Sequence, residues 1–215
     1  MKSLFLRLVH YIFKLRILEN LLVSLIQKST DRSWLIKLAP PNTYYNQHDL
    51  RYCDRYGITY KLYLYDYQSW LLYYFSENDS SFGALKYLKT GDSAIDVGGN
   101  IGQTALMMAK KVGQNGRVYS FEPFKRTFSA FKDNLSLNPK LTNVILENLA
   151  LGEKSEKLNM YVENIMNSGS NRIKPPGKVV SSEVEEVSII TLDEYIINNR
   201  LNEINLIKSM LKDLN

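Results

Sequence analysis

Residues 94–123, AIDVGGNIGQTALMMAKKVGQNGRVYSFEP, decide the fold of this chain. An apolar strand leads into a glycine-rich loop at 96–102, a helix of about three turns follows, and a second apolar strand ends at Glu122. Strand, glycine loop, helix, strand and terminal acid are the parts of a nucleotide-binding half of a doubly wound α/β sheet. The sequence therefore predicts a mostly parallel, Rossmann-like α/β fold.

The residue types in the loop suit a ligand that contains a ribose. Gly98 and Gly102 lack a Cβ, so the backbone can turn sharply and a ligand can approach closely. The helix that begins near Gly102 presents unpaired N–H groups and a positive dipole end to a carboxylate or a phosphate. Glu122, at the carboxyl end of the next strand, can accept hydrogen bonds from both hydroxyls of a ribose.

The dinucleotide fingerprint Gly-x-Gly-x-x-Gly is not met. Counted from Gly98, its second and third glycines would fall on Asn100 and Gln103. This failed glycine pattern disfavours an NAD-dependent enzyme, and no Gly-Lys-Ser/Thr of a P-loop follows either. An α/β domain whose glycines only allow tight packing is the competing interpretation. Asp96, Asn100 and Glu122 in one register argue against it.

The pattern Asp-x-Gly-x-Asn-x-Gly resembles motif I of the S-adenosylmethionine-dependent methyltransferases. From about residue 51 to 208 the chain resembles the FkbM family of these enzymes. Beyond motif I, the segments that carry this resemblance are 55–75, 85–91, 148–152, 168–171 and 190–195. The resemblance implies S-adenosyl-L-methionine as cofactor and O-methylation of a hydroxyl on a sugar, a glycan or a natural product.

The resemblance also implies roles for single residues. Asp96 would fix the glycine loop through backbone hydrogen bonds, Gly98 and Gly102 would admit the methionine part, and Glu122 would hold the ribose. The full set of implied cofactor-binding residues is Asp96, Gly98, Asn100, Gly102, Glu122, Asn148 and Ala150. The last two would border the adenine. The catalytic base is unknown, and the best place for one is an acidic stretch of the family that this chain lacks.

The departure from the family begins after Lys208. The family continues its fourth strand as Ile-Lys-Ile-Asp-Val-Glu-Gly-Phe-Glu, whereas this chain reads SMLKDLN. A coding sequence AAA ATC GAT GTT GAA GGA TTT GAA T gives the observed residues from Lys208 onward when one A is deleted. We therefore hypothesise a frameshifted, truncated family member, with the fourth strand left as an edge. The alternative function is an inactive remnant that at most binds the cofactor.

Composition sets further bounds. A length of 215 residues suits one catalytic domain with an extension, and 45% hydrophobic residues are ordinary for a folded chain. Cys53, the single cysteine, excludes an internal disulfide and is expected as a half-buried apolar residue. His10 and His48 have no Cys or His partners at metal-ligand spacing, so no metal site is predicted.

Residues 1–28 carry five Lys/Arg against one Glu, so the basic balance of the chain is local and does not argue for nucleic-acid binding. Apolar residues at intervals of three and four predict one amphipathic helix. Its stripe consists of Leu4, Leu8, Tyr11, Leu15, Leu18, Leu22 and Leu25. Arg7, Lys14 and Arg16 interrupt the segment too often for a transmembrane span, and no signal-peptide cleavage site follows. A cytoplasmic location is expected.

Two interpretations of this helix remain open. It packs on the catalytic domain or a second subunit, or it lies on an anionic membrane surface as a peripheral contact. Packing is favoured, because amphipathic helices are most often buried against protein. Residues 1–48 are thus expected to be this helix and a linker at 40–48, and residues 49–215 the methyltransferase domain.

Tyrosines recur at period two between the linker and the glycine loop. Tyr63, Tyr65 and Tyr67 would fall on one face of a strand. An aromatic face can stack on sugar rings, which suits a glycan acceptor. Packing against a sheet is the commoner role of such a face, because Tyr has a high strand propensity. Neither the acceptor nor the oligomeric state follows from the sequence.

Overall fold

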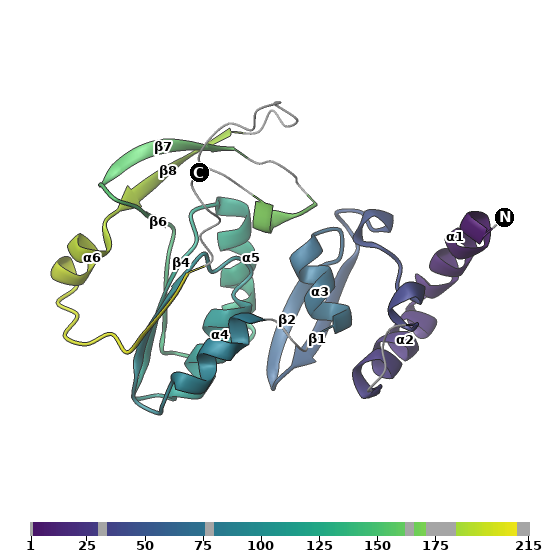
Figure 1. Ribbon diagram of the computed structural model, residues 1–215, viewed down its shortest axis with the longest axis horizontal. Coiled ribbons are helices and arrows are strands. Elements are labelled where there is room, and N and C mark those ends of the chain that lie inside the picture. The colour runs from purple at the N-terminus through teal and green to yellow at the C-terminus, as the bar shows by residue number, and fades with distance from the viewer. Residues whose placement is uncertain (1, 30–33, 76–79, 162–165, 171–183, 210–215) are drawn as a thin grey trace.

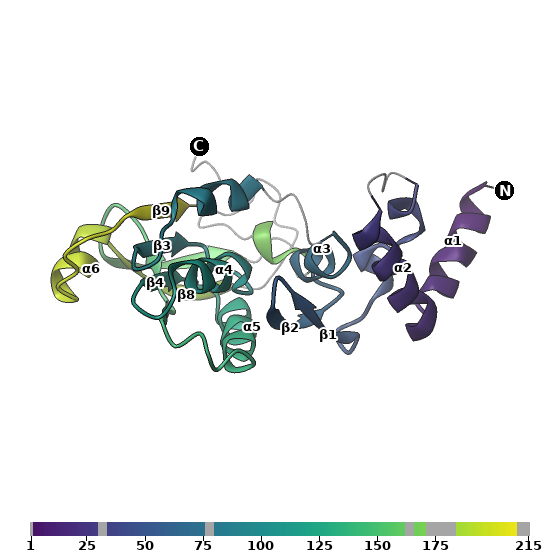
Figure 2. The same ribbon diagram turned by 90° about the horizontal axis from the view of Figure 1, so that it is seen from below.

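The computed structural model describes residues 2–29, 34–75, 80–161, 166–170 and 184–209. These residues form an elongated molecule of two neighbouring parts (Figure 1). One part is a parallel sheet with its helices. The other, towards the N-terminus, is a β-hairpin with three α-helices. Figure 2 shows the first two helices furthest from the sheet, beyond the hairpin.

The sheet is parallel throughout, which confirms the predicted α/β fold. Its strands are β3 Ser93–Val97, β4 Arg117–Phe121, β5 Val144–Glu147 and β9 Leu206–Ser209. Their order is β5-β4-β3-β9, so the chain moves outward from β3 in one direction and later returns to its other side. The strand order reverses beside β3, and ligands of such sheets bind at that point, outside the carboxyl ends of the strands.

Both faces of the sheet are covered in the part of the chain that the structure describes. Ala94 and Val118 pack with α4 Gln103–Val112 and α5 Lys125–Ser136 in the main core. Ile95 and Phe121 face the other way and contact Tyr195 of α6 Leu192–Asn198, with the two aromatic ring centroids 4.7 Å apart. Burial on both faces is expected of a parallel sheet.

The remaining elements connect and flank the sheet. They are η3 Ser80–Tyr87, β6 Ala150–Leu151, β7 Glu156–Tyr161, η4 Ser168–Ser170 and β8 Val184–Ile190. The strands β6, β8 and β7 form a second, small sheet, seen above the main sheet in Figure 1.

The N-terminal part has its own order of elements. They are α1 Lys2–Phe13, α2 Arg16–Lys28, η1 Ile36–Leu38, η2 Asn42–Tyr44, β1 Leu50–Arg55, β2 Ile58–Tyr63 and α3 Tyr67–Phe75. The strands β1 and β2 pair antiparallel through a tight turn, in which Tyr56 and Gly57 both have positive φ, as a two-residue hairpin requires.

The single helix predicted over 1–28 is wrong, because the helix breaks at Leu15, which is extended. Lys14 beside the break donates to the carbonyl oxygen of Tyr44 at 2.6 Å and pairs with Asp49. The predicted stripe is split as a result. Leu8 is exposed while Leu22 is fully buried, so the stripe does not form one face.

The predicted linker and tyrosine strand are also corrected. Within 40–48, η2 forms and Tyr45 is buried in the core that α2 shares with the hairpin and α4. The strand β2 ends at Tyr63, and Tyr67 begins α3. Asp66 caps that helix by accepting from the backbone N–H of Ser69 at 3.0 Å. The cap overrides the period-two pattern, so the three tyrosines do not share a strand face.

Candidate functional site

The glycine loop lies at the carboxyl ends of β3 and β4, where the strand order predicts a ligand site. Gly98, Asn100 and Gly102 have φ values of 82°, 50° and 90°, so every second residue is left-handed. Glycine and asparagine are the residues that adopt this conformation most readily. The N–H groups of Gly98 and Gly99 both donate to the carbonyl oxygen of Phe121 at 3.0 Å. The loop is therefore fastened to the end of β4.

Glu122 also holds the glycine loop, through its carboxylate. One carboxylate oxygen accepts from the backbone N–H of Asn100 at 2.7 Å. The other accepts from the backbone N–H of Phe124 at 3.1 Å and from the hydroxyl of Thr127 at 2.6 Å. Glu122 is only 5% exposed, and this burial raises the pKa of its carboxyl while the three donors oppose the rise.

These donors limit what Glu122 can offer to a ribose. A carboxylate has about four acceptor sites, and three of them are used within the protein. At most one ribose hydroxyl can therefore be accepted without moving a partner, rather than the two expected from the sequence. The role of Glu122 toward a ribose stays a prediction.

Asp96 makes different contacts from those expected. Its carboxylate is fully buried and bonds to the ammonium of Lys208 on β9 at 2.7 Å and to the hydroxyl of Ser120 on β4 at 3.3 Å. Burial raises the pKa of the Asp96 carboxyl, while Lys208 and Ser120 act in the opposite direction. The glycine loop is instead held by Phe121 and Glu122.

Gly102 has a packing reason to be glycine. A Cβ at this position would lie 2.3 Å from the ring of Phe131 on α5, far inside contact distance. A Cβ on Gly99 would lie 2.4 Å from the hydroxyl oxygen of Ser120. The loop thus lies directly against α5 and β4, and the missing side chains make room for protein atoms as well as for a bent backbone.

Comparison of the sequence with known protein families shows the family of this chain. Residues 96–209, more than half of the sequence, match the methyltransferase FkbM domain. The match begins at Asp96 and includes the loop, Glu122 and Lys208. The chain belongs to the FkbM methyltransferase family.

Solved structures overlap with this FkbM protein only in part. A putative rRNA methylase from Clostridium thermocellum is 24% identical, with 33% of this chain and 38% of that chain covered and a TM-score of 0.31. TYW2 from M. jannaschii in complex with AdoMet is 19% identical over 47% and 44% of the two chains, with a TM-score of 0.36. A SAM-dependent methyltransferase from Aquifex aeolicus is 27% identical over 37% and 42%, with a TM-score of 0.30.

The chain therefore spans less than half the length of each of these solved structures. No curated protein matches the sequence. The assignment to the FkbM family rests on the family match.

Asn100 connects the loop of this FkbM domain to the N-terminal part. Its side-chain amide exchanges hydrogen bonds with the hydroxyl of Ser168 at 3.1 and 3.2 Å. The backbone N–H of Ser168 donates to Asp66 at 3.0 Å, just before α3. The segment 168–171 is one of those that carry the family resemblance. Its described residues, 168–170, thus begin beside the loop.

Asn148 and Ala150 lie after β5, next to the end of β4. The side-chain amide of Asn148 donates to the carbonyl oxygens of Glu122 and Pro123 at 2.9 and 2.8 Å. Ala150 is buried with Phe124 in a small apolar cluster. Asn148 therefore shapes the backbone beside Glu122, and its place at an adenine stays a prediction.

Lys208 is the site residue that sequence reasoning missed. The sequence identifies it only as part of the fourth strand. The available signal is that a lysine inside an apolar parallel strand requires a buried partner of opposite charge. Cys53, by contrast, is half-buried as expected, and burial raises the pKa of its thiol to about 11. The described residues contain no group of three or more His, Cys, Asp or Glu placed to hold a metal ion.

Proposed function

We propose that this chain binds S-adenosyl-L-methionine at the 96–102 loop and transfers its methyl group to a hydroxyl of a sugar, a glycan or a natural product. The observation that carries the proposal is the loop itself. Its three left-handed residues, fastened by Glu122, lie at the carboxyl edge where the strand order reverses. Membership of the FkbM family supports methyl transfer as the reaction.

The residues present fit the parts of this cofactor. The first turn of α4, which begins after Gly102, offers backbone N–H groups to the methionine carboxylate. Glu122 offers one acceptor site to a ribose hydroxyl. When bound, the cofactor supplies an electrophilic methyl group on sulfur. The protein would contribute chiefly by orienting the acceptor oxygen in line with the methyl–sulfur bond.

Binding of the cofactor to Glu122 variants tests the proposal. We expect Glu122→Ala to weaken binding of S-adenosyl-L-methionine by about tenfold or more, because both the ribose acceptor and the support of Asn100 are lost. Isothermal titration of the full chain measures the dissociation constant. Glu153→Ala, a carboxylate removed from an exposed position, is the matched control.

The role of Glu122 in holding the loop must be separated from ligand contact. Thr127→Val removes one internal donor of Glu122 but leaves the carboxylate in place, so it should change affinity much less than Glu122→Ala. An unchanged dissociation constant in Glu122→Ala would show that the ribose assignment is wrong. A wild-type chain that does not bind the cofactor would overturn the proposed function for this chain.

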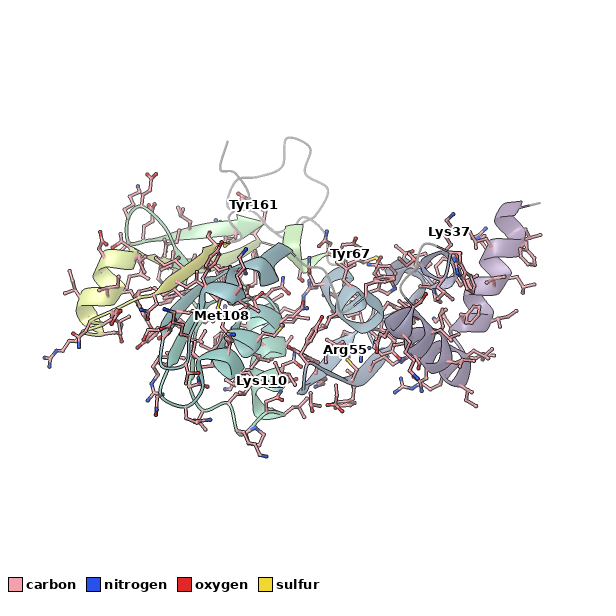
Figure 3. All side chains as sticks on the ribbon, turned by 60° about the horizontal axis from the view of Figure 1, so that its bottom comes forward. Lys37, Arg55, Tyr67, Met108, Lys110 and Tyr161 are labelled. Carbon is pink, nitrogen blue, oxygen red and sulfur yellow. The ribbon has the colours of Figure 1, made fainter. Side chains whose placement is uncertain are left out.

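The start of α3 supports a sugar as the acceptor. Tyr67, labelled in Figure 3, is 39% exposed. It stacks on Trp70, with ring centroids 5.8 Å apart and planes at 20°. It directly follows Asp66, which is linked through Ser168 to Asn100 of the loop. An exposed aromatic ring on the residue next to Asp66 can stack on the apolar face of a sugar.

Variants of Tyr67 test the choice of acceptor. A panel of monosaccharides and their methyl glycosides, with radiolabelled S-adenosyl-L-methionine, identifies a sugar that is methylated. For that sugar we expect Tyr67→Ala to raise KM by about tenfold, the effect of losing roughly one stacking contact, with kcat little changed. Tyr67→Phe should retain the wild-type KM, and Tyr87→Ala, an exposed tyrosine on η3, is the control. Methylation of phenols or other non-sugar hydroxyls alone would exclude the sugar.

The reading frame after Lys208 is a separate hypothesis. Sequencing the coding DNA and the mRNA from that codon onward tests it. If one inserted base restores Ile-Asp-Val-Glu-Gly, both sets of variants should also be measured in the restored chain, where the acidic stretch could supply a base. A DNA sequence without such a second frame would contradict the frameshift.

A further inference from the structure

The segment from α1 to η1 carries most of the large apolar side chains that are exposed among the described residues. Twelve of the twenty large apolar side chains that are exposed among the described residues lie between 4 and 36. They are Leu4, Phe5, Leu6, Leu8, Tyr11, Ile12, Leu15, Ile17, Leu21, Leu25, Trp34 and Ile36. Large exposed apolar patches mark surfaces that bind a protein or a membrane, and the exposed side chains of this segment are candidates for such a surface.

These exposed side chains lie on different sides of the helices from the side chains that pack in the core. The helix α2 turns Leu22, Val23 and Ile26 toward α3 and the hairpin, and those side chains are buried. On its opposite side, Ile17, Leu21 and Leu25 recur every four residues and form an exposed ridge.

The helix α1 has the same two-sided character. His10 is buried and bonds to the carbonyl oxygen of Lys37, so one side of α1 lies against η1. Leu4, Leu8 and Tyr11 form an exposed ridge on another side. Each of the first two helices therefore has one side that packs in the fold and an apolar ridge that the described structure leaves uncovered.

The exposed charges around these ridges are positive. Arg7, Arg16 and Lys28 are exposed on α1 and α2. Glu19, the one acidic residue in 1–28, is fully buried and paired with Arg51. Lys37, labelled in Figure 3, is also exposed at this end of the molecule. A surface with apolar ridges, exposed Arg and Lys, and no exposed acid on its helices complements a negatively charged layer.

We propose that the outer surface of α1, α2 and η1 binds the surface of an anionic lipid bilayer. The ridges would enter the boundary between headgroups and acyl chains, with the basic residues at the phosphates. Exposed Trp34 and Tyr11 suit the same depth, because Trp and Tyr favour membrane interfaces. No helix in the described ranges is long and apolar enough to cross a membrane. We propose that α1 and α2 lie on the bilayer surface.

A second copy of this chain is the competing occupant. In a two-fold dimer the same surface meets itself, so the arginines and lysines of one copy would face those of the other. With Glu19 buried against Arg51, the two helices have no exposed carboxylate to neutralise them. Charge therefore favours the bilayer over self-association.

Vesicle flotation of the full chain tests the proposal. Vesicles of equal parts phosphatidylglycerol and phosphatidylcholine should carry the protein upward, and phosphatidylcholine vesicles should carry much less. Leu8→Ser and Ile17→Ser, at side chains 58% and 83% exposed, should each reduce binding by about tenfold. Ile197→Ser, at a side chain 72% exposed on α6, is the matched control and should float as the wild type does.

Charge reversal provides the second comparison. Arg7→Glu with Arg16→Glu should abolish the preference for phosphatidylglycerol, whereas Lys132→Glu with Lys140→Glu, at exposed positions on and just after α5, should retain it. Circular dichroism checks that every variant is folded. Light scattering without lipid measures the oligomeric state.

Two results would overturn the proposal. One is a wild-type chain that stays at the bottom of the gradient with both kinds of vesicle. The other is a dimer that Leu8→Ser dissociates while vesicle binding is absent, which would assign the surface to a second copy. Flotation requires neither cofactor nor acceptor, so its outcome is independent of the proposed methyl transfer.

Discussion

The Glu19–Arg51 pair in the N-terminal part and the Asp96–Lys208 pair in the sheet are both buried, but they are supported very differently. Glu19 accepts from Arg51 twice, at 2.5 and 3.3 Å, and also from the hydroxyls of Tyr45 at 2.7 Å and Tyr74 at 3.4 Å. Asp96 has one short bond, to Lys208, and one long bond, to Ser120.

The difference indicates what each pair does. The Glu19 network joins α2, β1, α3 and the chain near η2, so two neutral donors and one cation share the stabilisation of one carboxylate. Asp96 depends on a single cation, and it stands directly before the glycine loop. The first arrangement should tolerate the loss of one partner, whereas the second leaves the buried carboxylate before the glycine loop dependent on Lys208 of β9.

Removal of Lys208 should have the largest effect. We expect Lys208→Met to lower the free energy of unfolding by about 3–5 kcal/mol, because it leaves the Asp96 carboxylate buried without a cation. Urea unfolding followed by circular dichroism measures the change. The double variant Asp96→Asn with Lys208→Met removes both charges and should recover most of the loss. A double variant as unstable as the single one would show that packing, not charge, explains the effect.

The loss in Lys208→Met should also depend on pH. Burial already raises the pKa of Asp96 above its unfolded value, and removing the cation raises it further. A carboxyl with a raised folded-state pKa is compatible with the fold when protonated, and stability is lost as the pH rises through that pKa. The deficit relative to wild type should thus be larger at about pH 8 than at about pH 5. A deficit that does not change with pH would contradict the charge argument.

The packing of the loop should have the next largest effect. Gly102→Ala forces a non-glycine residue to φ 90° and brings its Cβ to 2.3 Å from Phe131. We expect a loss of about 2–4 kcal/mol, from left-handed strain together with overpacking. Gly91→Ala is the matched control, because Gly91 has φ 92° and no atom near its Cβ position. It should lose only about 1–2 kcal/mol. Equal losses in urea unfolding would remove Phe131 from the explanation.

The sequence predicted the elements whose residues are contiguous. Strand, loop, helix and Glu122 could be read within 94–123 because the glycines and the apolar periods lie in one stretch. The fourth strand that the family resemblance implies up to Lys208 is observed as β9, and it pairs with β3.

The misses come from contacts between distant residues. Asp96 and Lys208 are 112 positions apart, and no local sequence pattern predicts their bond. The break in the predicted N-terminal helix lies beside Lys14, which bonds to Tyr44, 30 positions away. The helix at Tyr67 was missed for a local reason: its cap, Asp66, was read as a strand residue between tyrosines.

Removal of Arg51 should have the smallest of these effects and completes the comparison of the two ion pairs. We expect Arg51→Met to cost about 2 kcal/mol, less than Lys208→Met, because Tyr45 and Tyr74 still donate to Glu19. Adding Tyr45→Phe should then cost more in the Arg51→Met background than in the wild type, since the tyrosine has become the main donor to a buried carboxylate. A double-mutant cycle by urea unfolding measures this coupling. Strictly additive losses of stability would mean that Glu19 does not rely on shared donors. The smaller loss in Arg51→Met than in Lys208→Met would then have to be explained by the position of Asp96 in the sheet.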